Sequence, residues 1–299
     1  MLTKSTWLHL RIPFSYFLMP VYFFALAISP NFTESRLTWS FLIIHLLLYP
    51  ASNGFNSYFD KDEKSIGGLE YPPPVNKGLY YTSLLFDLAA LILALKVSAL
   101  FSAMLLVYGL VSKAYSHPSV RLKKYPIAGW LVIGLFQGFF AFLMCYVGIN
   151  GYELSNLAKA SVLLPAGLTS VMLWASYPLT QVYQHEQDAK SGDHTISMKL
   201  GIRGTFYFCA TVFALAAIAF FSYFAAYHKI KYSWAFIAIL SPVVLYFLIW
   251  LLRVFKDEAK ANYRGTMWMN HVSATCLNIF FIYFFLDSSQ VIQAIKGGF

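Results

Sequence analysis

Charged residues are scarce in this chain. They make up 12% of its 299 residues, whereas about a quarter of a typical soluble domain is charged. Hydrophobic residues make up 59%, and they stand in long runs between short polar breaks. One soluble core has no room for that much apolar surface. The composition therefore excludes an ordinary soluble domain and indicates a protein with several membrane-spanning helices.

Cysteine is also rare, and Cys145, Cys209 and Cys276 each stand alone in an apolar run. Disulfide frameworks and zinc sites need paired cysteines, so we interpret these three as packing residues. The formal charge of +9 raises the question of nucleic-acid binding, but the 22 Lys and Arg residues are spread over short loops. Because a nucleic-acid site needs a concentrated basic patch, we expect no nucleic-acid partner.

Nine apolar runs are long enough to cross a hydrocarbon core, which takes roughly 17 to 25 helical residues. They lie near residues 12–30, 37–55, 79–95, 97–115, 126–147, 159–181, 204–227, 232–253 and 266–286. The sequence therefore predicts an all-α integral membrane protein with nine transmembrane helices in a single domain over residues 1–299. The first run follows Lys4 and Arg11 as in a signal peptide, but we expect it to be retained as a helix.

The basic residues predict the orientation of these helices. With the N-terminus in the cytoplasm, six of the 22 Lys and Arg residues fall on the outer side: Arg36, Lys96, Lys159, Lys229, Lys231 and Lys296. The remaining 16 of the 22 fall on the cytoplasmic side, as the positive-inside rule requires. We expect the protein to lie in the cytoplasmic membrane of a bacterium.

Acidic residues are the scarcer charge, and they are unevenly placed. Seven of the 13 lie in two segments, after the second and the sixth apolar run: Asp60, Asp62, Glu63, Glu70, Glu186, Asp188 and Asp193. Four spans separate the two segments, so both face the cytoplasm. We expect the two polar segments to occupy about residues 54–78 and 181–203.

Helical spacing aligns the side chains of the first segment. Asn56 and Asp60 stand four residues apart, Glu63 extends their face, and Asp62 points away from it. In the second segment, one helical face carries Gln181, Gln184, His185 and Asp188. Carboxylate and amide oxygens on two facing helix ends are ligands that suit Mg2+. The alternative is that these acids are solvated and pair with nearby lysines.

These segments resemble the UbiA superfamily of intramembrane prenyltransferases, which have nine helices and two Asp-rich cytoplasmic motifs after helices two and six. The first motif of that family is matched here by Asn56, Asp60, Pro74 and Gly78. The second is matched by Asp188, Gly192, Thr195 and the pair Leu200 and Gly201. Tyr115, Ser116 and Lys123 resemble the family's loop after helix four, whose Tyr, Ser and Lys help to hold a diphosphate.

The chain departs from the family pattern at several motif positions. Ser57 and Lys64 stand where carboxylates are expected, and Gln184 replaces the first Asp of the second motif. Leu69 and Pro73 replace the two arginines of the first motif. Either the site binds metal with fewer charges and more amide ligands, or it serves another reaction.

The resemblance implies Mg2+-dependent transfer of an isoprenoid chain from a prenyl diphosphate to a small acceptor within the membrane. It implies metal ligands at Asn56, Asp60, Glu63, Gln184 and Asp188, and diphosphate contacts at Tyr115, Ser116, Lys123, Lys77 and Lys199. Asp60, Asp188 and His185 are the candidate catalytic residues, with His185 as a general base. The implied partners are the two substrates and membrane lipids, with no obligate protein partner and a site that faces the cytoplasm.

Two other functions fit parts of the sequence. A terpene cyclase of the UbiA type would quench the carbocation within its own chain and need no acceptor. A transporter or a non-catalytic lipid-binding protein would use Asp87 and His271, because ionisable residues within spans are functional candidates by default. The sequence shows no half-chain repeat of transporter type, which favours the enzyme.

Overall fold

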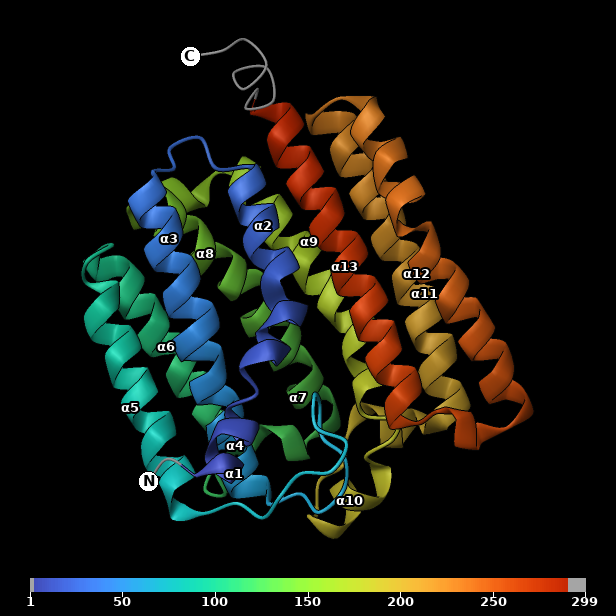
Figure 1. The fold of residues 1–299 in the computed structure, drawn as a ribbon. Helices are drawn as coiled ribbons and strands as arrows, with labels where there is room; N and C mark the ends of the chain where they lie inside the picture. Colours follow the sequence, from blue (N-terminus) through green and yellow to red (C-terminus); the bar gives the residue numbers. More distant parts are fainter. Residues whose placement is uncertain (1–2, 290–299) are drawn as a thin grey trace.

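The computed structural model describes residues 3–289, and helices are the only extended regular elements in that part of the chain. The predicted all-α class is confirmed for these residues. Lys296, which was counted on the outer side, lies outside the described residues. Figure 1 shows the long helices side by side, with the start of the chain at one end of the bundle and the end of α13 at the other.

The helical elements follow one another in nearly unbroken stretches. The first half of the chain contains α1 (Lys4–Leu10), η1 (Ile12–Leu18), α2 (Met19–Ala27), α3 (Glu34–Leu42), η2 (Ile43–Leu48), α4 (Tyr49–Asp60), α5 (Lys77–Ala94), α6 (Ala99–Ser116), η3 (Leu122–Lys124), α7 (Pro126–Ile133), η4 (Gly134–Phe140) and α8 (Ala141–Asn150). The second half contains η5 (Leu154–Ala158), α9 (Ala160–Ser176), η6 (Tyr177–Thr180), α10 (His185–Lys190), α11 (Ile196–Tyr227), α12 (Ile230–Lys256), η7 (Glu258–Lys260) and α13 (Tyr263–Ser288).

Eight helical stretches of the described chain are long and apolar enough to cross a membrane. They are Lys4–Ala27, Lys77–Ala94, Ala99–Ser116, Pro126–Asn150, Ala160–Thr180, Ile196–Tyr227, Ile230–Lys256 and Tyr263–Ser288. The remaining predicted span coincides with the continuous helical stretch 34–60, formed by α3, η2 and α4. That stretch is more polar, since it includes Glu34, Arg36 and Asn53 as well as the first acidic motif. The count of nine spans and the cytoplasmic N-terminus stay predictions.

The helical stretch Lys4–Ala27 begins before the first predicted span, and it is interrupted at Arg11. The backbone of Arg11 is left-handed (φ 47°, ψ 44°), and the following turn η1 is a 3₁₀-helix that begins with Ile12 and Pro13. Proline has no N–H to continue the hydrogen bonds of α1. The break directs Arg11 inward, where its guanidinium donates to the backbone oxygen atoms of Gly67 (2.9 Å) and Asn53 (3.3 Å).

The seventh predicted span also begins earlier than the hydropathy indicates, because α11 extends back to Ile196 through a kink. Gly201 lies at φ 70° and ψ 169°, which is a region essentially reserved for glycine. The turn before the kink holds the second polar segment against the bundle. The Leu200 and Gly201 pair of the motif therefore marks the bend itself.

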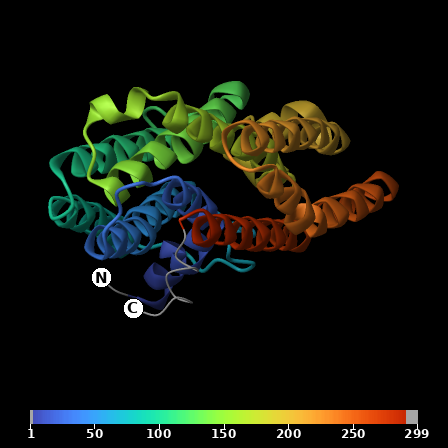
Figure 2. The same ribbon diagram turned by 90° about the horizontal axis from the view of Figure 1, so that it is seen from above.

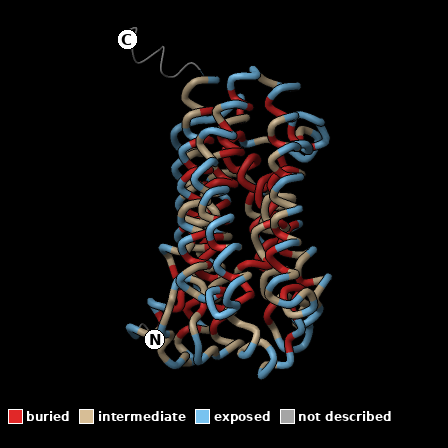
Figure 3. Tube along the Cα trace, turned by 90° about the vertical axis from the view of Figure 1, so that its right-hand side faces the viewer, coloured by how far each residue is buried: buried red, intermediate tan, exposed pale blue. Residues whose placement is uncertain are grey.

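Aromatic side chains fill much of the bundle interior. Figure 3 shows buried residues along the middle of the molecule and exposed ones on its outside. Phe24 of α2 stacks on Phe281 of α13 with ring centroids 4.5 Å apart, and Phe220 of α11 stacks on Phe236 of α12 at 4.9 Å. In Figure 2, α11 and α12 lie together on one side of the bundle. The three cysteines are buried and free, which confirms their interpretation as packing residues.

Candidate active site

The two polar segments meet at the end of the bundle where the chain begins. A cavity of about 300 Å³ lies there between α4, α6, η3 and α10. Asp60 and Asp62 line it from the first segment, and Asp188 and Asp193 line it from the second. Lys64 and Glu186 form an ion pair on the outside, which joins the same two segments. Sequence positions more than 120 residues apart thus form one acidic site.

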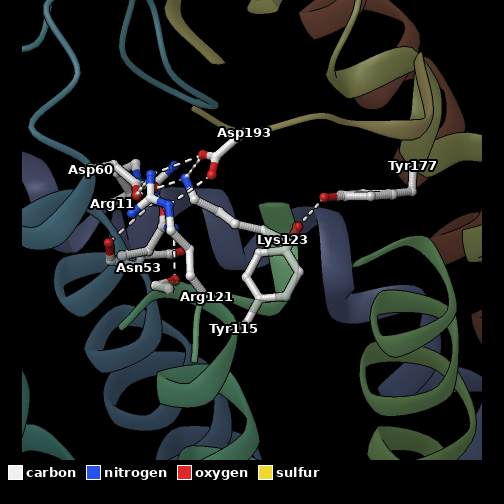
Figure 4. Close-up of polar contacts among 10 residues, drawn as sticks. Arg11, Asn53, Asp60, Tyr115, Arg121, Lys123, Tyr177 and Asp193 are labelled. Atoms are coloured by element: carbon white, nitrogen blue, oxygen red, sulfur yellow. Dashed lines mark hydrogen bonds and ion pairs between the residues drawn. The ribbon is translucent and has the colours of Figure 1, made fainter. Parts of the chain in front are cut away.

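Two basic residues of the loop after α6 bind two of these aspartates. Arg121 donates from Nε and from a terminal nitrogen to the two carboxylate oxygens of Asp193, at 2.7 and 2.9 Å. Lys123 Nζ lies 2.6 Å from Asp60 Oδ1 and 3.1 Å from Asp193 Oδ2. Figure 4 shows both basic side chains directed at Asp193. Burial lowers the pKa of Lys123, but Asp60 and Asp193 outweigh it and raise that pKa overall, so the ammonium stays charged.

Asn56 fixes the other oxygen of Asp60. Its Nδ2 donates to Asp60 Oδ2 at 2.7 Å and to Ser116 Oγ at 2.9 Å. The first contact spans one helical turn of α4, as the spacing predicted. The second ties α4 to the end of α6. Asn56 therefore orients Asp60 with its amide nitrogen, while its own amide oxygen has no hydrogen bond within the described residues.

Asp62 and Asp188 line the same cavity without an ion-pair partner within 4 Å among residues 3–289. Burial and the neighbouring Asp60 raise the pKa of Asp62 to about 6. Burial is also the largest cause for Asp188, whose pKa rises to about 7, with Asp193, Asp62 and Asp60 adding to the effect. These two carboxyl groups therefore hold a proton more tightly than an exposed aspartate does, mainly because they are buried.

Arg11 also lines the cavity. Its side chain is 9% exposed, and two backbone oxygens are its hydrogen-bond acceptors. Figure 4 shows its guanidinium beside Asp60. A buried guanidinium that is bound to carbonyl groups keeps its full positive charge available to an anion.

Below the charged rim, the cavity becomes apolar. The hydroxyl groups of Tyr115 and Tyr177 hydrogen-bond to one another across the cavity, from α6 and η6 (Figure 4). The walls on that side include apolar and aromatic side chains, with a few polar ones such as Gln137 and Asn270 among them: Leu18, Tyr108, Val132, Ile133, Phe136 and Leu173. The arrangement suits a molecule with an anionic head and a hydrocarbon tail.

The structure brings together seven of the residues singled out from the sequence. Asn56, Asp60, Tyr115, Ser116, Lys123, Gln184 and Asp188 all line the cavity. Glu63, Lys77 and Lys199 are exposed and do not line it. Asp62, expected to point away, faces the cavity in place of Glu63 because the chain leaves its helix at Asp60 and turns through a left-handed Lys61.

His185 lies behind the cavity and not in its wall. Its Nε2 is 2.8 Å from Ser197 Oγ, and Ser197 in turn bonds to Thr205 Oγ1 at 3.0 Å. This chain of contacts ties α10 to the first turns of α11. Burial lowers the pKa of His185. In this structure, its contacts are those of a residue that holds the second segment in place.

Sequence reasoning missed the roles of several residues in and beside the cavity. Arg11 was read only as a topological charge, although the Pro13 that follows it signals a break in the helix. Asp193 and Arg121 were noted, but their pairing joins positions 72 residues apart. Tyr177 stands in an apolar run, and no local pattern distinguishes it from the other 20 tyrosines.

Within residues 3–289, no three His, Cys, Asp or Glu side chains form a group that could hold a metal ion. Asp60 and Asp193 lie within ion-pair distance of Lys123, at 2.6 and 3.1 Å. The donor types nevertheless fit Mg2+, because carboxylate and amide oxygens of Asn56, Asp62, Gln184 and Asp188 line the cavity.

Solved structures share this fold. A UbiA homolog from Archaeoglobus fulgidus bound to GPP and Mg2+ has a TM-score of 0.68 at 18% identity, with 94% of this chain and 99% of that chain covered. The same homolog bound to DMAPP and Mg2+ has a TM-score of 0.69 at 18% identity, with 95% and 99% covered. A structure described for the biosynthesis of digeranylgeranylglyceryl phosphate synthase in membranes has a TM-score of 0.61 at 16% identity, with 94% and 98% covered.

Among curated proteins, none is significantly similar in sequence. The family comparison is decisive, because the UbiA prenyltransferase family matches residues 17–274. That range includes both polar segments and every residue of the cavity except Arg11 and Phe14. The chain is thus a member of the UbiA prenyltransferase family.

Proposed function

We propose that this protein transfers an isoprenoid chain from a prenyl diphosphate to a small acceptor within the membrane, with Mg2+ as cofactor. One observation carries the proposal. Four aspartates from two distant segments surround a cavity whose charged rim holds Lys123 and Arg11 and whose floor is apolar. A prenyl diphosphate has the matching shape, with an anionic head and a hydrocarbon tail.

The charge balance of the cavity supports a divalent cation. Its four aspartates outnumber the three basic residues Arg11, Arg121 and Lys123, so a diphosphate would add negative charge to a site that already has more acidic than basic groups. The carboxylates and the diphosphate would repel one another strongly in a partly buried site, because the charges are poorly screened there. Asn56, Asp60, Asp62, Gln184 and Asp188 are the residues that would hold Mg2+. When bound, Mg2+ would neutralise the charge that develops on the leaving diphosphate.

The protein's own residues bind and orient the substrate. Lys123 and Arg11 offer positive charge to the diphosphate oxygens, and Asn56 keeps Asp60 in its rotamer through the 2.7 Å hydrogen bond. The aromatic side chains deeper in the cavity shield the prenyl tail from water. Their ring faces also stabilise positive charge on an allylic carbon.

The proposal includes a cytoplasmic orientation for the site and a location in the cytoplasmic membrane of a bacterium. The motif segments, the loop after α6 and the start of the chain lie at one end of the bundle (Figure 1). Most of the basic loop residues were assigned to that side. Prenyl diphosphate, the acceptor and membrane lipids are the proposed partners.

The experiment is an assay for diphosphate release. Membranes that contain the protein are incubated with radiolabelled prenyl diphosphates, Mg2+ and candidate acceptors, and both diphosphate and lipid products are measured. Asp60→Ala and Asp188→Ala should each abolish release, and Glu63→Ala, at an exposed position outside the cavity, should leave it intact. No release with any chain length from folded protein would refute the proposal.

The same assay separates transfer from cyclisation. A transferase needs the acceptor, whereas a terpene cyclase forms a hydrocarbon or alcohol from the diphosphate alone. Mass spectrometry of an organic extract made without acceptor distinguishes the two. A cyclised product in that extract would replace the transferase assignment.

A further inference from the structure

Lys123 joins the two polar segments at the cavity. Its Nζ lies 2.6 Å from Asp60 Oδ1 in the first segment and 3.1 Å from Asp193 Oδ2 in the second. All three side chains line the cavity, and none of them is more than 13% exposed. One buried ammonium group therefore bridges carboxylates that the fold brings together from two distant segments.

Both oxygens of Asp60 are engaged with donors of the protein itself. Oδ1 faces Lys123, and a guanidinium nitrogen of Arg121 lies 3.7 Å from the same atom. Oδ2 accepts the 2.7 Å hydrogen bond from Asn56 Nδ2. Asn56 thus turns its amide nitrogen to Asp60, and this nitrogen is a hydrogen-bond donor without the lone pairs that a cation needs. The two candidate metal ligands of α4 are therefore both occupied in this arrangement.

Asp193 is held more firmly than Asp60. Arg121 binds both of its oxygens, at 2.7 and 2.9 Å, and a two-point contact of this kind fixes the geometry of the carboxylate as well as balancing its charge. Asp193 therefore keeps a cationic partner whether or not Lys123 is beside it. Among residues 3–289, Asp60 has one close cation, Lys123, since Arg121 lies farther away at 3.7 Å.

An ammonium group and a magnesium ion seek the same atoms of Asp60. Carboxylate oxygens accept hydrogen bonds from lysine, and they are also ligands that Mg2+ prefers. Two cations at one carboxylate repel each other, most strongly where the charges are poorly screened. A diphosphate offers Lys123 other acceptors, because phosphate oxygens bind ammonium groups well. The flexible four-carbon stem of a lysine allows its Nζ to turn from one acceptor to another.

We propose that Lys123 is an exchangeable counter-ion of Asp60, which balances this carboxylate when no metal is bound and turns to the diphosphate when Mg2+ and prenyl diphosphate bind. Asp193 keeps Lys123 within reach of the cavity during the exchange. The inference rests on the proposed function, because it describes how the metal and the diphosphate enter one site. It follows that Lys123 weakens the binding of metal alone and strengthens the binding of the diphosphate.

Metal binding without any diphosphate tests the exchange. Mn2+ is the probe, because it binds to the same oxygen ligands as Mg2+, and electron paramagnetic resonance measures the free ion in a titration of the full-length protein in detergent. Lys123→Met has a neutral side chain of similar length. This variant should bind Mn2+ about tenfold more tightly than the unaltered protein, as the loss of one competing charged hydrogen bond would produce.

Two controls separate competition from a general effect of charge. Arg11→Met also removes one positive charge from the cavity, but Arg11 donates to backbone oxygens and not to Asp60, so its gain should be less than about threefold. In an Asp60→Asn background, Lys123→Met should likewise gain less than about threefold, because the contested carboxylate is absent. Lys123→Gln repeats the titration if the melting curve shows that Lys123→Met is unfolded. No gain on replacing Lys123, or an equal gain in Arg11→Met, would overturn the inference.

Binding of geranyl thiodiphosphate with Mg2+ separates this inference from the proposed function. The unaltered protein should bind it, and Lys123→Met should bind it more weakly while binding Mn2+ more tightly. A lysine that only supported the fold would not shift the two affinities in opposite directions. If the unaltered protein does not bind the analogue, the proposed function fails, and so does the transfer of Lys123 to a diphosphate. If it binds the analogue but Lys123→Met gains no Mn2+ affinity, the inference alone fails.

Discussion

The four aspartates of the cavity divide into two pairs with different surroundings. Asp60 and Asp193 are 5% and 1% exposed and are bound to Lys123. Asp62 and Asp188 have no such partner in the described chain, and their pKa values are raised. A buried carboxylate is tolerated when a cation satisfies it. Asp60 and Asp193 therefore position Lys123. Asp62 and Asp188 would be stabilised most by an added cation.

This division predicts how stability depends on pH. Burial raises the pKa of Asp62 to about 6 and that of Asp188 to about 7, so the folded protein binds protons more tightly than the unfolded chain does. Stability from these groups is fully present below the ordinary pKa of 3.8, and it is lost progressively as the pH rises from there to about 7. Without Mg2+, the melting temperature in detergent should be at least about 3 °C higher at pH 5.5 than at pH 8.

Two controls assign the pH effect to the cavity. Asp188→Asn should remove much of the difference between pH 5.5 and pH 8, because the amide does not titrate. Millimolar Mg2+ at pH 8 should raise the melting temperature of the unaltered protein and have less effect on the variant. The same pH difference in both proteins would contradict the assignment to Asp188.

Lysines provide a second comparison at the scale of single residues. Lys123 lies in the cavity and is 13% exposed, whereas Lys199 is exposed and lies outside it. Lys123→Ala removes a buried charge-assisted contact, so kcat/KM for diphosphate release should fall by about 100-fold, or about 3 kcal/mol. Lys199→Ala should change it by less than about twofold. Similar losses in the two variants would indicate a general effect of charge.

At the scale of helices, the contact between η4 and α9 depends on a glycine, Gly138, whose lack of a side chain lets the two backbones approach closely. A Cβ on Gly138 would lie 2.7 Å from the Cα and 2.8 Å from the backbone nitrogen of Ser170. Ser170 Oγ donates to the oxygen of Gly134 at 2.7 Å and accepts from the nitrogen of Phe139 at 3.1 Å. The serine therefore satisfies two backbone groups of η4, which is a π-helix and is wider than an α-helix.

Gly138→Ala should consequently lower the melting temperature by about 3 °C or more, because neither backbone can move without losing these hydrogen bonds. Gly167→Ala is the matched control on α9, since a Cβ there meets nothing within 4 Å. Alanine also favours a helix over glycine, so the control should be unchanged or more stable. Equal destabilisation by both changes would argue against close packing at Gly138.

The helices themselves were the most predictable part of the molecule, and their irregularities were the least. Long apolar runs located the spans because a membrane helix must be apolar over its whole length. Hydropathy carries no signal for the left-handed Arg11 or for the kink at Gly201. In the stretch 34–60, hydropathy instead understates the helix. The helix is continuous there, although its polar residues lower the mean hydropathy.

For the molecule as a whole, local spacing predicted some of the residues that line the cavity, whereas the others are brought there by turns and tertiary contacts. The pairing of Asn56 with Asp60 follows from one helical turn. The choice of Asp62 over Glu63 depends on the turn at Lys61, and the place of Arg11 depends on contacts with Asn53 and Gly67. No periodicity in a single sequence reports such contacts, because they join segments that are 42 and 56 residues apart.

The orientation of the whole bundle gives the last prediction. Glu63 is exposed at the end that carries the cavity, and Lys159 is exposed in the loop before α9, at the other end. The native cysteines are buried, so Glu63→Cys and Lys159→Cys can be labelled in the natural background. In intact bacterial cells, a membrane-impermeant maleimide should label Lys159→Cys and should reach Glu63→Cys only after lysis. The reverse pattern would place the cavity on the outer face, away from the cytoplasm, and would contradict the positive-inside assignment.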